Sequence, residues 1–153
     1  MRFRKCVLRL LISAGLSAAA WGQKGSSAAE RSLYEAVNHE RKAQGLGMLK
    51  WDQGLATAAR QHAQEMAKRS AVEHRFPDEP SLSSRATKAG ARFVSISENV
   101  VQAASAKMAH AEFMNSPKHK ANILDPDVDS VGIGAAERGG QLFVVQDFAK
   151  AKK

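Results

Sequence analysis

Cysteine is almost absent from this chain of 153 residues, in which Cys6 is the single example. A chain with one cysteine cannot form an internal disulfide, so its stability must come from packing. Cys6 also lies in an N-terminal segment that we expect to be removed. A thiol mechanism and a cysteine-ligated zinc site are therefore excluded for the mature protein.

Several common catalytic motifs are missing as well. The sequence contains no Gly-x-Ser-x-Gly nucleophile elbow, no phosphate-binding loop and no dinucleotide fingerprint. The segment 62–66 (His-Ala-Gln-Glu-Met) lacks the second histidine of a zinc-protease helix. The segment 110–112 (His-Ala-Glu) lacks the cysteine pair that holds zinc in deaminases. Each of these enzyme classes is therefore excluded on its motif.

Basic residues outnumber acidic ones, 23 to 15, and aromatic residues make up only 6% of the chain. Removal of the N-terminal segment would leave 19 basic and 15 acidic residues, a net charge of +4. Nucleic-acid binding calls for a dense basic patch with interleaved aromatic residues, and no such patch occurs. We therefore expect no nucleic-acid partner.

The first 22 residues are typical of a secretory signal peptide. A basic start precedes the mostly apolar stretch 7–20, and small residues place the cleavage after Ala20 or Gly22. The alternative is an uncleaved membrane anchor, but the apolar stretch is short and contains Arg9. The sequence therefore predicts a secreted or periplasmic protein with no transmembrane anchor after cleavage.

The rest of the chain has the length of one domain, which we place at residues 29–148. Residues 23–28 form a short polar linker before it, and residues 149–153 form a basic tail. Hydrophobic periodicity and turn residues predict five helices, over 29–44, 52–69, 81–89, 104–114 and 116–124. They predict three strands, over 92–96, 130–136 and 141–148, the last two joined as a hairpin. Helices precede most of the strands, which indicates an α+β class with helices packed on a small, mainly antiparallel sheet.

Three of the five histidines have ordinary structural interpretations. His39 lies among charged residues, which predicts exposure to solvent. His62 shares the apolar stripe of its helix, which favours a buried residue with satisfied hydrogen bonds. His110 fits either the surface or a packing contact. None of the three is a preferred site residue.

His74 and His119 are the better candidates, because one lies in a loop and the other at a helix start. Ser116 can cap the helix that presents His119, and Pro117 suits its first position. Neutral imidazoles and carboxylates bind zinc and other divalent ions, so Glu98 and Glu112 extend the candidate set. Glu98 follows a predicted strand and could equally have a structural role.

Seven segments carry a resemblance that covers about Leu33 to Phe148. They are 37–41 (Val-Asn-His-Glu-Arg), 49–52 (Leu-Lys-Trp-Asp), 55–67, 97–100 (Ser-Glu-Asn-Val), 113–124 (Phe-Met-Asn-Ser-Pro-Lys-His-Lys-Ala-Asn-Ile-Leu), 131–134 (Val-Gly-Ile-Gly) and 144–148 (Val-Val-Gln-Asp-Phe). In this order and spacing, the chain resembles a bacterial member of the CAP superfamily, which contains the cysteine-rich secretory proteins, antigen 5 and pathogenesis-related group 1. The resemblance implies a three-layer α-β-α sandwich with a central cleft.

The resemblance also implies which residues line that cleft. In many members two histidines and two acidic residues lie there and can hold a divalent ion such as zinc. The matching positions are His74, His119 and Glu98, and Ser116 stands where the second acidic residue is expected. Glu112, one turn earlier, shares a helix face with Ser116 and can substitute for that residue.

Members of the superfamily have been credited with sterol or lipid binding, protease-like activity and partner binding, so the fold does not decide the activity. We predict a monomeric binding protein with a shallow His/Glu cleft rather than an efficient enzyme. Its ligand would be a divalent metal ion, a small molecule, a lipid or an envelope component, with His74 and His119 as metal ligands. The alternative is an extracytoplasmic hydrolase acting on peptides or the cell envelope, with Glu98 as general base and a metal-held water as nucleophile.

Overall fold

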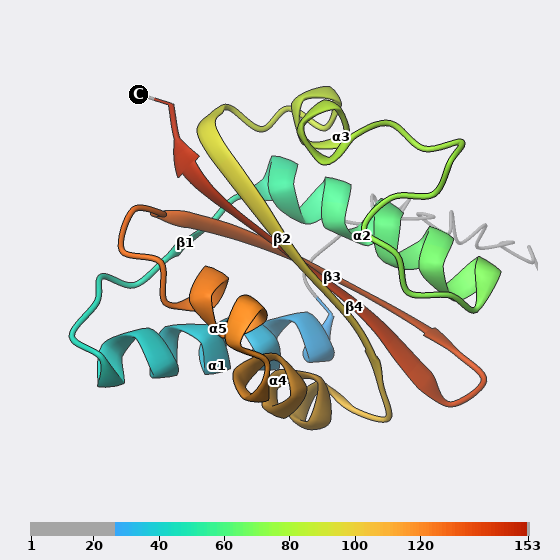
Figure 1. Ribbon diagram of the computed structural model, residues 1–153, viewed down its shortest axis with the longest axis horizontal. Helices are drawn as coiled ribbons and strands as arrows, with labels where there is room; N and C mark the ends of the chain where they lie inside the picture. Colours follow the sequence, from blue (N-terminus) through green and yellow to red (C-terminus); the bar gives the residue numbers. More distant parts are fainter. Residues whose placement is uncertain (1–26, 153) are drawn as a thin grey trace, which may run out of the picture.

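Figure 1 shows the computed structural model of the chain, which describes residues 27–152. A central sheet lies between two helical layers. Helices α2 (Gln53–Arg69) and α3 (Leu82–Lys88) cover one face of the sheet. Helices α1 (Ala28–Ala43), α4 (Ala106–Asn115) and α5 (Pro117–Ile123) cover the other. The predicted α+β class and three-layer arrangement are confirmed.

The sheet has four strands in the order β1-β3-β4-β2, so β2 is one of its two edges. The strands are β1 (Lys50–Trp51), β2 (Phe93–Ala103), β3 (Ser130–Arg138) and β4 (Gln141–Ala151). β1 pairs with β3 in parallel, and the other two pairings are antiparallel. The sheet is therefore mainly antiparallel, as predicted.

Local capping signals place the helix starts correctly. Asp52 caps α2 as predicted, because its carboxylate accepts the Leu55 N–H at 2.8 Å. Ser116 occupies the N-cap position of α5 and Pro117 follows it, but the Ser116 side chain accepts no capping hydrogen bond. The predicted position of the helix is thus confirmed, and the predicted capping bond of Ser116 is wrong.

Two strands run further than their sequence patterns predict. β2 continues to Ala103, so Glu98 lies in the middle of this strand and not after it. β4 continues to Ala151, which places residues 149–151 of the predicted tail in the sheet. The two extensions share one cause: β2 and β4 pair along nearly their whole lengths, and Ala149 is buried between Ile96 and Ser130.

Two glycines of β3 let α2 approach the sheet closely. A Cβ atom on Gly132 would lie 2.0 Å from the backbone nitrogen of Ala56, and one on Gly134 would lie 2.2 Å from the carbonyl carbon of Ala59. No side chain fits in either place. α2 therefore lies directly on β3, and the residue of β4 opposite Gly132, which is Asp147, is completely buried.

The predicted signal peptide, residues 1–22, lies outside the described residues, as do residues 23–26 of the linker and Lys153 of the tail. Ala28, at the end of the predicted linker, is the first residue of α1. Between residues 27 and 152, no helix has both the length and the apolar character that crossing a membrane requires.

Candidate functional site

The candidate site lies at the free edge of β2, where neighbouring residues serve opposite helical layers. Successive side chains of a strand point to opposite faces of the sheet. Glu98 points to the side of α3, where it contacts Arg85. Asn99 points to the side of α5, where its side chain donates to the backbone oxygen of His119 at 3.0 Å. Two adjacent residues thus connect both layers at the sheet edge.

His74 lies in the loop between α2 and α3, and a buried carboxylate orients its ring. Its Nδ1 lies 3.0 Å from Oε1 of Glu98, while 62% of its side chain is exposed. This hydrogen bond raises the pKa of His74 above its ordinary value, against the opposing effect of partial burial. Nε2 has no partner within residues 27–152 and is the nitrogen available to a ligand.

Glu98 is buried, with both carboxylate oxygens already in use. Oε1 accepts from His74, and Oε2 accepts from the guanidinium of Arg85 at 2.5 Å. Arg85 is itself buried and also donates to the carbonyl oxygens of His74 and Pro80. The Glu98 backbone oxygen accepts from the side chain of Asn122 on α5. Glu98 is therefore held by groups from both helical layers.

His119 lies on α5, and its ring packs edge-on against Phe113 with the centroids 5.2 Å apart. Partial burial, and then the positive charge of His74 when protonated, lower the pKa of His119 below its ordinary value. His119 is thereby kept neutral, which is the state that binds metal ions. The two histidines belong to different layers, but adjacent residues of β2 contact them, Glu98 at the His74 ring and Asn99 at the His119 backbone oxygen.

The predicted residues Glu112 and Ser116 join His119 rather than His74. All three line a pocket of about 370 Å³ together with Val101 and Asn115. The structure thus groups the predicted residues as His74 with Glu98, and His119 with Glu112 and Ser116. In the part of the chain that the structure describes, no three His, Cys, Asp or Glu side chains are placed to hold one metal ion together.

Two residues of this site were not among the sequence candidates. Arg85 is the guanidinium that contacts Glu98, and Asp147 faces Glu98 directly across the β2–β4 pair. Asp147 did have a signal, because a carboxylate is unusual in a strand segment as apolar as 142–148, where Gln146 is the one other polar residue. Arg85 had none, since basic residues are common on short surface helices.

The remaining histidines fit their predicted roles. His39 is exposed. His62 is buried and satisfied, with its ring nitrogens 2.9 Å from a Glu79 carboxylate oxygen and 2.7 Å from the Glu73 carbonyl oxygen. His110 packs between helices, 3.5 Å from Glu40.

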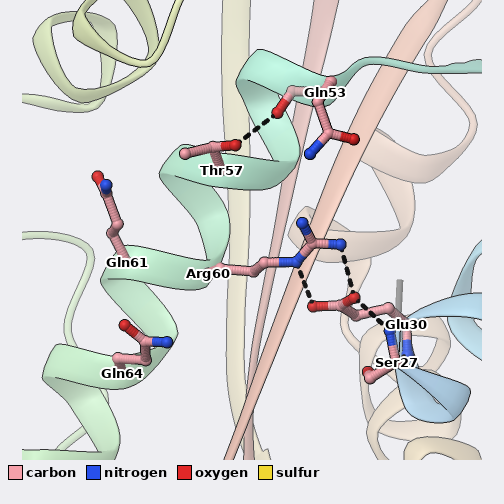
Figure 2. A pocket seen from close by; sticks show the side chains of 7 residues that line it. All are labelled: Ser27, Glu30, Gln53, Thr57, Arg60, Gln61 and Gln64. Atoms are coloured by element: carbon pink, nitrogen blue, oxygen red, sulfur yellow. Dashed lines mark hydrogen bonds and ion pairs between the residues drawn. The ribbon is translucent and has the colours of Figure 1, made fainter. Parts of the chain in front are cut away.

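A separate polar pocket of about 250 Å³ lies between the start of α1 and α2 (Figure 2). Arg60 reaches from α2 to the carboxylate of Glu30 and binds both oxygens at 2.8 Å. Glu30 also accepts the backbone N–H of Ser27 at 2.7 Å, which completes a capping box. The Glu30 carboxylate and the Arg60 guanidinium of this pocket are thus paired with each other. None of the predicted site residues lines this pocket.

A family model described as the cysteine-rich secretory protein family, CAP, matches residues 34–148. The chain belongs to the CAP family. The resemblance inferred from the sequence motifs is thereby confirmed. The uncharacterised protein YkwD of Bacillus subtilis is 32% identical to this CAP domain over 115 residues, which is 74% of this chain and 44% of YkwD.

Solved structures share the CAP fold. An extracellular protein of Bacillus anthracis that contains an SCP domain superposes with a TM-score of 0.75 at 24% identity, covering 81% of this chain and 40% of that protein. An outer surface protein of Borrelia burgdorferi superposes with a TM-score of 0.74 at 22% identity, covering 81% of this chain and 93% of that protein. The CAP chain thus spans less than half the length of YkwD and of the B. anthracis protein.

Proposed function

We propose that the protein is an extracytoplasmic binding protein whose cleft at the β2 edge binds a divalent metal ion, such as zinc, between His74 and His119. The observation that carries the proposal is the fixed orientation of His74 by a buried carboxylate. Histidines that bind metal ions commonly donate their second ring nitrogen to a carboxylate in this way. The His74–Glu98 bond at 3.0 Å fits that arrangement and leaves Nε2 for the metal.

The donor set suits zinc but not tight binding. Imidazole nitrogens are favoured zinc ligands, and His119 is kept neutral by its surroundings. Protein zinc sites use three or four side chains, however, and Glu98 is committed to His74 and Arg85. Two histidines would leave several coordination positions to water or to a ligand, so we expect weak, exchangeable binding.

The pocket beside His119 is suited to a small molecule. Its volume of about 370 Å³ is within the range of small-molecule sites. Val101 is its one aliphatic lining residue, and the others are polar or charged. A small molecule or part of an envelope component that contacts His119 and Glu112 would fit this pocket.

The hydrolase alternative has less support. A general base needs an oxygen directed at a water molecule within hydrogen-bond reach. Both carboxylate oxygens of Glu98 already accept hydrogen bonds, and its side chain is only 3% exposed. We therefore assign Glu98 the role of orienting His74.

An extracytoplasmic location is part of the proposal. It is supported by the basic and apolar pattern of residues 1–22. It also fits the descriptions of two proteins with the same fold, one as extracellular and one as an outer surface protein.

Zinc titration by calorimetry at neutral pH tests the proposal. The mature protein should give a binding heat that is lost in both His74→Ala and His119→Ala. His39→Ala is the matched control, because His39 is exposed on α1, which supplies none of the candidate site residues, and should leave the heat unchanged. Equal heats for all four proteins would refute the metal site.

A turnover assay separates binding from hydrolysis. Casein and peptidoglycan fragments are incubated with the zinc-loaded protein and with its Glu98→Gln variant. We expect no turnover above background from either. Turnover that disappears in Glu98→Gln would overturn the binding proposal in favour of the hydrolase.

A further inference from the structure

Asp147 is a buried acid without a hydrogen-bond donor. It lies in the middle of β4 with none of its surface exposed. No N–H or O–H donor within residues 27–152 reaches either of its carboxyl oxygens. An ionised carboxylate is rarely buried without donors, because water is lost and nothing replaces it.

Strand register brings this acid against Glu98. In an antiparallel pair, opposite residues alternate between hydrogen-bonded pairs and closer, non-hydrogen-bonded pairs. The Ala149 backbone oxygen accepts from the N–H of Asp129, so it points toward β3. Residues two apart in a strand direct their backbone N–H and C=O groups to the same side, so those of Asp147 also point toward β3 and away from β2. On β2, the backbone oxygen of Glu98 correspondingly points to the free edge of the sheet, where the Asn122 side chain donates to it. Glu98 and Asp147 therefore form a close pair, with Cα atoms about 4.5 Å apart and side chains on one face.

The two acids share a single cation. The charged groups that act on Asp147 are Glu98 on β2 and Arg85 on α3. β3 contributes only Gly132 opposite Asp147, and through this glycine the α2 backbone closes over the sheet. Arg85 donates to Glu98, whose other oxygen accepts from His74. Glu98 thus has the donors that an ionised carboxylate needs, whereas Asp147 has none.

We propose that Asp147 is protonated at neutral pH and donates its carboxyl hydrogen to Glu98, so that the two acids carry one negative charge, which Arg85 balances. A carboxyl hydrogen on Asp147 removes its buried charge and gives one of its two oxygens a partner. Burial, and then the Glu98 carboxylate, raise the pKa of Asp147 well above its usual range, against the opposing effect of Arg85. Asp147 is thereby a positioning residue, which holds Glu98 and, through it, the ring of His74. The importance of this positioning for metal binding rests on the proposed function, whereas the protonation of Asp147 does not.

Carbon-13 NMR of the carboxyl groups tests the protonation state directly, on the mature protein without added metal. The Asp147 signal should be that of a neutral acid at pH 7 and should be missing from the spectrum of Asp147→Asn. Asp129 is the internal control, because against the opposing effect of burial, hydrogen bonds from the Ala151 N–H and Lys150 lower its pKa. An Asp147 carboxyl that titrates together with Asp129 would overturn the inference.

The positioning role is tested by the titration of His74 in two variants. Asparagine keeps a neutral donor at position 147, so Asp147→Asn should leave the NMR titration midpoint of His74 unchanged. Leucine has no donor, so Asp147→Leu should shift that midpoint. Equal effects of the two substitutions would refute positioning by a hydrogen bond. If Asp147→Leu does not fold, the wild-type carboxyl titration and a shifted midpoint in Asp147→Asn remain sufficient to overturn the proposal.

Parallel zinc titrations keep the two proposals separable. An ionised Asp147 in a protein that still binds zinc through His74 and His119 would overturn this inference alone. A protonated Asp147 in a protein without zinc binding would overturn the proposed function and leave the acid pair standing.

Discussion

Arg85→Met should be among the most destabilising single substitutions in the domain. Removing one partner of a buried ion pair costs about 3–5 kcal/mol, because the other charge stays buried and unbalanced. The Arg85–Glu98 contact of 2.5 Å is such a pair, since only 6% of the Arg85 side chain and 3% of the Glu98 side chain are exposed. Arg85 also donates to the carbonyl oxygens of His74 and Pro80, and each lost bond adds about 0.5–1.5 kcal/mol.

The total expected loss is about 4–8 kcal/mol in the free energy of unfolding, comparable with the whole stability of many domains, about 5–15 kcal/mol. Urea unfolding followed by circular dichroism measures this loss. Arg75→Met is the matched control, because Arg75 is exposed and donates to one carbonyl, that of Glu79. Surface substitutions of this kind usually change stability by about 0.5 kcal/mol.

A double-mutant cycle tests the reasoning behind the number. If the charge of Glu98 is what Arg85 balances, Glu98→Gln removes most of the penalty of Arg85→Met. The coupling free energy between the two substitutions should then reach about 2–3 kcal/mol. Strict additivity would refute the argument, because it would mean that Arg85 stabilises the fold through packing and carbonyl bonds alone.

Three further predictions concern other parts of the structure. Gly132→Ala should lower the free energy of unfolding in urea by about 3 kcal/mol or more, because the α2 backbone occupies the place of the new methyl group. Gly47→Ala is the control and should cost less than about 1 kcal/mol, because the space around Gly47 is open; similar costs would contradict the close approach of α2 to β3. Glu98→Gln should lower the pKa of His74 in NMR titrations, and an unchanged midpoint would contradict the orienting bond. In the wild type, the raised pKa of His74 adds stability at acidic pH that is lost as the pH rises through the folded-state pKa, and Glu98→Gln should reduce this contribution. Arg41→Met should lower the melting temperature by about ten degrees or more, because the buried guanidinium donates to four backbone carbonyls. This shift corresponds to about 3 kcal/mol in a domain of this size. A shift of only a few degrees would mean that water replaces the guanidinium as the donor to these carbonyls.

Local features of the chain were predictable because their causes lie within a few residues. Asp52 caps α2 through a bond three residues away, and the Gly139-Gly140 turn closes the hairpin between β3 and β4. The histidines of the candidate site could be named because they lie in a loop and at a helix start, which neighbouring residues indicate.

The contacts between distant segments were not predictable in the same way. The local pattern places Glu98 after a strand, because only its pairing with Asp147 across the sheet shows that the strand continues. The partnership of Glu98 with Arg85 depends on where α3 packs, which no local pattern encodes. Family motifs identified the chain and its histidines, but they did not single out the buried acid pair beneath them.

The placement of Glu98 and Asn99 on one strand, facing opposite helical layers, has a mechanical consequence. His74 belongs to the layer of α2 and α3, and His119 belongs to the layer of α1, α4 and α5. A ligand that contacts both rings would connect the two helical layers at the free edge of β2. Its binding free energy would oppose separation of the layers, so occupancy should slow amide exchange in α3 and α5 together, although neither helix covers the other's face of the sheet.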